Sequence, residues 1–162
     1  MDPKVRVSTL IRSHDDPEKV KDSVNSIFPD WEPSNYPERF SFPVTRSSEI
    51  ISAEIHSIDC LLSILRENRV LDTALDAMAM KAHKGGTVFY LSRQSASIGK
   101  VSFVLEEYVL GGLIEVTLEG EDIEIWLEQQ TWHTGRERIP REVGDEYAMD
   151  SDGEASEWFQ SS

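Results

Sequence analysis

The apolar residues of this chain recur with two different spacings, and the spacing changes several times along the sequence. In "KVRVSTLIR", which begins at residue 4, Val5, Val7 and Thr9 alternate with polar residues, as in a half-buried strand. In "DDPEKVKDSVNSIFP", Val20 and Val24 are four residues apart and lie on one face of a helix. A chain of 162 residues that mixes both patterns is expected to form one α+β domain.

The full pattern predicts the order β-α-β-β-α-α-β-β-β-α, a mainly antiparallel sheet with helices packed on one face. The first helix has Asp16 as its cap and Pro17 at its first position, and Ser57 is expected to cap the second helix. The predicted strands are 4–12, 39–44, 48–55, 87–91, 100–106 and 113–118, and the predicted helices are 17–28, 58–66, 70–84 and 121–130.

The strand "TVFYL" is apolar almost throughout, which is typical of a strand covered on both faces. On this interpretation Tyr90 belongs to the core. Residues 1–135 are expected to form the single domain. Residues 136–162 are acidic and rich in serine, so we expect a flexible C-terminal tail.

The formal charge of the chain is −14, and it is unevenly distributed. Residues 66–100 contain six Lys or Arg and three acids, a balance of +3, so the remainder carries −17. Within this segment "KGGTVFYLSRQSASIGK", residues 84–100, has three cations and no acid. Adaptation to high salt and repulsion of anionic partners explain the general excess of acid equally well.

Other features of the sequence indicate the compartment. Cys60 is the only cysteine, so an intrachain disulfide is impossible, as is usual in a reducing cytoplasm. The first residues lack the apolar core of a signal peptide, and the longest nearly apolar run, "YVLGGLIEV", is too short to span a bilayer. We therefore expect a soluble cytoplasmic protein without a membrane partner.

The sequence lacks the common catalytic and nucleotide-binding motifs. The chain lacks G-x-x-x-x-G-K-[ST], G-x-G-x-x-G, G-x-S-x-G and H-E-x-x-H. His56 and Cys60 are four residues apart, but Cys60 is better interpreted as a small residue at a packed helix edge. Asp16 is explained by capping, and the adjacent Asp15 is expected to be solvated. The sequence predicts no enzyme activity, no metal and no cofactor.

Three blocks of the chain carry a family resemblance: "DPEKVKDSVNSIFP", "LRENRVLDTALDAM" and "GGTVFYLSRQSASIGKVSF". In this order and spacing they resemble an archaeal family of uncharacterised small proteins described as predicted RNA-binding. The resemblance covers about residues 4–135. It implies a fold similar to ribosomal large-subunit protein five, and an older description of the family compares it with the double-stranded-RNA-binding domain.

The resemblance implies RNA binding, with structured RNA or the protein subunits of an RNA-processing assembly as partners. The candidate RNA-binding residues are those that match the family pattern or carry a positive charge in this region. They are Arg66, Arg69, Lys84, Arg93, Gln94 and Lys100. Arg66 and Arg69 share one helix face if the helix is unbroken, and Arg93, Gln94 and Lys100 follow a buried strand, so the cations could converge on one rim.

Alternatives remain open for these residues. Arg66 and Arg69 could pair with neighbouring acids, Arg93 could bind a carbonyl, and Asp72 is interpreted as a helix cap or an arginine partner. The protein could also be a homodimeric or protein-interaction domain without nucleic-acid contact. An enzyme acting on a phosphate-bearing metabolite would require a pocket with a carboxylate or histidine beside the cations.

Overall fold

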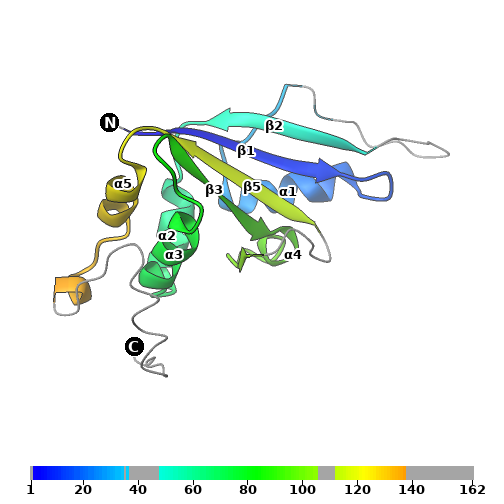
Figure 1. The fold of residues 1–162 in the computed structure, drawn as a ribbon. Coiled ribbons are helices and arrows are strands. Elements are labelled where there is room, and N and C mark those ends of the chain that lie inside the picture. Colours follow the sequence, from blue (N-terminus) through cyan, green and yellow to red (C-terminus); the bar gives the residue numbers. More distant parts are fainter. Residues whose placement is uncertain (1, 35, 37–47, 106–111, 138–162) are drawn as a thin grey trace.

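Figure 1 presents the computed structural model of the chain, which describes residues 2–34, 36, 48–105 and 112–137. A five-stranded sheet has the order β2-β1-β5-β3-β4, and all neighbouring strands are antiparallel. The strands are β1 (Lys4–Ile11), β2 (Glu49–Ile55), β3 (Gly86–Ser92), β4 (Phe103–Val104) and β5 (Leu113–Glu119). The helices are α1 (Pro17–Ile27), α2 (Asp59–Glu67), α3 (Leu71–Ala79), α4 (Arg93–Ala96) and α5 (Ile123–Gln130), followed by the 3-10 helix Thr134–Glu137. The predicted α+β class and element order are confirmed in these residues.

The core lies between one face of the sheet and the helices. Val5 and Val7 of β1 are buried, whereas Arg6 between them points outward and is exposed. Val24 of α1 is fully buried, and so is Trp31 in the loop after this helix. The indole of Trp31 donates a hydrogen bond to the carbonyl oxygen of Val7 at 2.8 Å, so the predicted loop contributes a large side chain to the core. Figure 1 shows α1 behind the strands and α2 and α3 below them.

The predicted start of α1 is confirmed. Asp16 is the cap, its carboxylate accepts a hydrogen bond from the amide of Glu18, and Pro17 is the first helical residue. The predicted strand 39–44 lies outside the described residues. Within the described part of the predicted strand 100–106, only Phe103–Val104 forms a strand. It starts late because the amide of Lys100 donates to the carbonyl oxygen of Ser95 and closes the turn after α4.

The prediction that "TVFYL" is covered on both faces is wrong. Thr87, Phe89 and Leu91 are buried on the helix side, but Val88 and Tyr90 point to the other face and are only half-buried. The high apolar content of this strand therefore does not reflect a second covering layer. Tyr90 is a surface residue at the β4 side of the sheet rather than part of the core.

The predicted break between the second and third helices is confirmed. The α2 helix ends at Glu67, and Arg69 adopts a left-handed conformation with φ of 58°. The amide of Val70 then bonds to the carbonyl oxygen of Leu65 and ends the turn. Because of this turn, Arg69 does not continue the face of α2 that carries Arg66.

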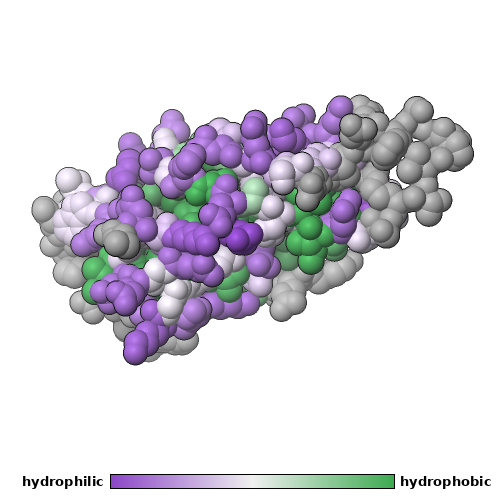
Figure 2. Space-filling model, turned by 90° about the horizontal axis from the view of Figure 1, so that it is seen from above, coloured by the Kyte–Doolittle hydropathy of each residue, from purple (hydrophilic) through white to green (hydrophobic). Residues whose placement is uncertain are grey.

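Most of the described surface seen from above is hydrophilic, with smaller hydrophobic areas between the polar side chains (Figure 2). Among the described helices none has the length and apolar content needed to cross a bilayer.

Two glycines with positive φ allow a test of how closely β3 packs against β5. A Cβ at Gly86 would collide with the carbonyl oxygen of Leu118 on the paired strand, whereas a Cβ at Gly99 would have no neighbour within 4 Å. We expect Gly86→Ala to lower the free energy of unfolding by about 3 kcal/mol and Gly99→Ala by about 1 kcal/mol, the cost of the left-handed backbone alone. Urea unfolding of the two variants measures this difference, and equal losses would contradict the packing of β3 on β5.

Candidate functional site

Arg93, the first residue of α4, is buried and does not present its charge to solvent. Its exposed fraction is 4%. Its Nη1 donates to Thr9 Oγ1 and to the carbonyl oxygen of Leu10, both at 2.7 Å, and its Nη2 lies 3.1 Å from Asp15 Oδ2. These contacts hold the guanidinium between the end of β1, the loop before α1 and the end of β3.

Gly112 provides the space for this guanidinium. A Cβ at Gly112 would lie 2.6 Å from Nη2 and 2.7 Å from Cζ of Arg93, and its φ of 88° also favours glycine. The carbonyl oxygen of Gly112 accepts the backbone amide of Arg93 at 3.1 Å. The chain therefore approaches the guanidinium closely just before β5.

Asp15 is the anionic partner of Arg93, and the prediction that it is solvated is wrong. Burial raises the pKa of Asp15, but the backbone amide of Arg12 and the charges of Arg93 and Arg12 outweigh it, so the pKa lies below its usual value. Burial lowers the pKa of Arg93, and Asp15 opposes this effect. Because the two charges neutralise each other in the interior, Arg93 is not available to an external polyanion.

Arg66 makes contacts within the protein instead of forming a free cation. Its guanidinium is exposed, but Nη1 donates to the carbonyl oxygen of Trp132 at 3.1 Å and Nη2 to that of Gln130 at 3.3 Å. Nearby, Nε2 of His133 lies 3.0 Å from Oδ1 of Asp72. Arg66 therefore satisfies carbonyl groups at the end of α5, as cations commonly do at helix C-termini. Asp72 thus contacts a histidine, a partner that the sequence did not indicate.

The other candidates do not gather in one place. Lys84 is exposed in the turn before β3, where the amide of Gly120 bonds to the carbonyl oxygen of Gly85. Gln94 and Lys100 are exposed beyond the opposite end of β3. A seven-residue strand is about 20 Å long, so Lys84 is separated from these two by that order of distance. The single rim of cations predicted from the sequence is not observed.

A different cationic surface lies along β3 and β4. The stretch without acids is longer than residues 84–100, because it extends from Ala77 to Leu105 and also includes Lys81. The Lys81 ammonium lies 5.0 Å from the centre of the Tyr90 ring, which is a cation–π distance. We call the exposed and half-buried residues of this stretch that surround Tyr90 the β3–β4 surface, which comprises Ala77, Met80, Lys81, Val88, Tyr90, Phe103, Val104 and Leu105. The exposed Lys100 precedes β4 by three residues.

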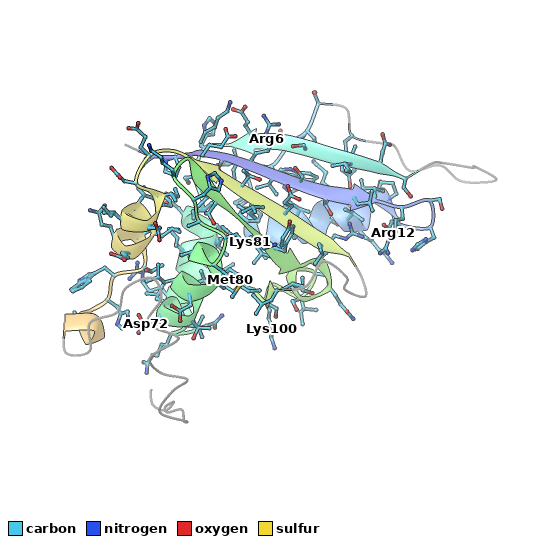
Figure 3. The ribbon with its side chains drawn as sticks, in the orientation of Figure 1. Arg6, Arg12, Asp72, Met80, Lys81 and Lys100 are labelled. Atoms are coloured by element: carbon cyan, nitrogen blue, oxygen red, sulfur yellow. The ribbon has the colours of Figure 1, made fainter. Side chains whose placement is uncertain are left out.

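Figure 3 shows Lys81 near the middle of the view with Met80 and Lys100 below it, Arg6 among the upper strands, and Arg12 at the right, just after β1. Met80 and Lys81, which follow α3, line a small surface depression together with Val104 and Leu105 at β4. Lys81 was missed by the sequence interpretation, although extending the search for acid-free sequence by a few residues would have included it.

The described residues do not contain a group of three or more His, Cys, Asp or Glu that could hold a metal ion. Cys60 is half-buried, and its thiol lies 3.9 Å from the carbonyl oxygen of Ser26. Burial raises the pKa of the Cys60 thiol, which disfavours the thiolate form that binds metals.

Comparisons with known proteins identify relatives in archaea. A UPF0201 protein from Sulfurisphaera tokodaii is 31% identical over 135 residues, which cover 79% of this chain and 88% of that protein. A UPF0201 protein from Methanothermobacter thermautotrophicus is 26% identical over 142 residues, covering 88% of this chain and 98% of the relative. The crystal structure of a UPF0201 protein from Methanococcus jannaschii has a TM-score of 0.65 at 23% identity, and the match covers 80% of this chain and 99% of that one. No family model matches the chain.

The Arg93–Asp15 pair predicts how stability depends on pH. Asp15→Asn leaves the buried guanidinium without a counter-charge, so we expect the free energy of unfolding near neutral pH to fall by about 3 kcal/mol. Because its folded pKa is lowered, the Asp15 carboxylate stabilises the protein above its unfolded pKa of about 3.9, and this contribution is lost as the pH falls through the folded pKa. The difference between wild type and Asp15→Asn should therefore shrink in acid.

Urea unfolding of both proteins near neutral pH and in acid measures this difference. Asp22→Asn, an exposed carboxylate on α1, is the matched control and should change stability little. A difference that stays constant as the pH is lowered would contradict the lowered pKa of Asp15.

Proposed function

This chain belongs to the archaeal UPF0201 family, and we propose that it acts as a non-catalytic RNA-binding protein. The observation that carries the proposal is the absence of acids from residues 77–105 of a chain whose formal charge is −14. This stretch contains four cations, and three of them, Lys81, Lys84 and Lys100, are exposed. A local excess of positive charge on an otherwise acidic protein favours contact with a polyanion at that surface and repels it elsewhere.

The β3–β4 surface has the chemistry to bind RNA. Lys81 and Lys100 can contact phosphates, and the exposed Met80 and Leu105 offer apolar contact to ribose or bases. Since the Lys81 ammonium already covers the ring of Tyr90, this ring is a poor platform for stacking an unpaired base. Recognition through phosphates and shape fits this surface better, which favours structured RNA.

The number of exposed cations limits the affinity. Contacts from three lysines would give an affinity that falls by roughly one to two powers of ten over a fourfold rise in salt. Glu115 pairs with Tyr90 across the sheet and places an acid at the border of the surface. RNA binding is therefore expected to be weak and dependent on salt, unless subunits of an RNA-processing assembly add contacts.

The resemblance of the fold to ribosomal large-subunit protein five is consistent with this proposal and remains a prediction. The same applies to the cytoplasm as the compartment, which follows from the single cysteine and the composition of the sequence. The absence of catalytic motifs from the sequence is the reason for proposing binding rather than catalysis.

A homodimer is the second candidate, and two exposed apolar side chains favour it. Leu10 and Ile50 are 43% and 73% exposed, and they face each other across β1 and β2. Adjacent apolar side chains on the uncovered face of a sheet are common in protein interfaces. Sedimentation that shows a dimer in wild type and a monomer in Ile50→Lys would support this candidate, and a wild-type monomer would contradict it.

Charge reversal tests the RNA proposal. We expect Lys81→Glu and Lys100→Glu each to weaken binding of a hairpin RNA by about tenfold at low salt, because each change removes a phosphate contact and adds repulsion. Each should also reduce the slope of log affinity against log salt by about one. Fluorescence anisotropy with a labelled hairpin measures both quantities.

The matched control is Lys21→Glu on α1, which changes the net charge by the same amount outside the β3–β4 surface. If the control weakens binding as much as Lys81→Glu does, only the total charge matters and the proposed surface is wrong. If wild type does not bind the hairpin even at low salt, RNA binding itself is refuted.

A further inference from the structure

The β3–β4 surface is apolar as well as cationic. Met80 and Leu105 are 52% and 62% exposed, and both line the small depression between the segment after α3 and β4. The other residues that line this depression are apolar or aromatic apart from Lys81, and none of them is an acid. Exposed apolar side chains that gather in one place commonly mark a docking surface. The partner that fits here has apolar groups and carboxylates together.

Two lysines supply the positive charge of this area. Lys81 lines the depression, and Lys100 is exposed and precedes β4 by three residues. Among the residues that the structure describes, neither ammonium has an ion pair with a carboxylate. The ammonium of Lys81 lies 5.0 Å from the centre of the Tyr90 ring, a contact that leaves its charge uncompensated. Both lysines can therefore receive a carboxylate.

Other exposed cations of the described chain already have acceptors. The ammonium of Lys4 and the guanidinium of Arg6 each lie 3.2 Å from Oε2 of Glu54. The guanidinium of Arg66 donates to two carbonyl oxygens near the end of α5. An acidic partner would have to displace these contacts, whereas it could join the lysines beside β4 directly.

The sequence itself contains a segment with the matching chemistry. Residues 142–162 contain seven Asp or Glu and no Lys or Arg, a balance of −7, which is half of the net charge of the chain. Trp158 and Phe159 directly follow Glu157, so large aromatic groups and a carboxylate are adjacent. Residues 138–162 lie outside the described residues. Their charge and their aromatic residues complement the β3–β4 surface.

The point at which the described chain stops is close enough to this surface. Nε2 of His133 lies 3.0 Å from Oδ1 of Asp72 in the first turn of α3, and the 3-10 helix Thr134–Glu137 follows directly. The α3 helix has nine residues, so it is about 14 Å long, and Met80 comes immediately after it. Trp158 is 21 residues beyond Glu137, and such a stretch spans at most about 70 Å. The length of the chain therefore permits the contact.

We propose that residues 142–162 dock on the β3–β4 surface of their own chain. The aromatic rings of Trp158 and Phe159 lie over the shallow apolar depression, and the acids beside them pair with the exposed lysines. A segment linked to the surface it binds is present at an effective concentration of about 1 mM, so weak contacts are sufficient. The segment then competes with RNA for the same lysines. This competition rests on the proposed RNA binding, whereas the docking itself does not.

Carbodiimide crosslinking of the full chain without RNA tests the docking. The reagent joins a carboxylate to an amine without a spacer, so it reports direct contacts, and mass spectrometry of the peptides identifies them. We expect crosslinks from Glu154 or Glu157 to Lys81 or Lys100. Lys19, an exposed lysine on α1, is the control, and its crosslinks to the segment should be about tenfold fewer, because only a docked segment has this effective concentration.

Two results of this experiment would overturn the proposal. One is the absence of crosslinks from the segment to Lys81 and Lys100, or a yield no higher than at Lys19. The other appears when unlabelled protein is mixed with protein labelled with heavy nitrogen. Crosslinks that join a light and a heavy peptide as often as two of one kind would show that the segment binds a second copy.

A variant without a change in charge tests the competition. Trp158→Ala combined with Phe159→Ala should lower the yield of crosslinks to Lys81 and tighten binding of the hairpin RNA by about threefold at low salt, because the anchored segment is released. Trp132→Ala, which removes a tryptophan that is 45% exposed elsewhere, is the matched control and should change neither quantity. Unchanged crosslinking in the double variant would overturn the assigned role of the two rings.

The two measurements separate this inference from the RNA proposal. Crosslinks to Lys81 and Lys100 without any RNA binding would support the docking and refute RNA binding. RNA binding that depends on Lys81, without these crosslinks, would support the RNA proposal and overturn the docking.

Discussion

The buried ion pair of Arg93 and Asp15 is the interaction on which the arrangement of this protein depends most. It joins the end of β1, the loop before α1 and the junction of β3 with α4, and it requires a glycine at position 112. A buried guanidinium is costly unless its partners are complete, and here Thr9, Leu10 and Asp15 supply acceptors. One cation of the acid-free stretch is therefore structural.

The other cations of this stretch are notable because the rest of the chain is acidic. In a chain with a net charge of −14, residues 77–105 contain cations and no acid, and Glu115 of the neighbouring strand lies beside Tyr90. The proposed contact with the phosphates of a folded RNA rests on the exposed lysines of this stretch.

The architecture distributes the cations over different parts of the protein. Lys81 lies beside β4 and Lys100 precedes this strand, whereas Lys19 belongs to α1. Arg66 is used in another way, since it binds the carbonyl oxygens that follow α5 and joins α2 to the C-terminal part of the described chain. Residues that are equivalent in a count of charges therefore differ in the structure, because Arg93 is buried and the lysines are exposed.

The sequence by itself determined the local structure. The spacing of apolar residues predicted the strands and helices, the cap Asp16, and the break after Glu67, because these features depend on neighbours within a few positions. It could not show that Arg93 pairs with Asp15, since 78 positions separate them, or that Tyr90 lies on a partly open face. Those contacts depend on which strands become neighbours. The tertiary structure alone decided which charged side chains are neutralised and which remain exposed to a ligand.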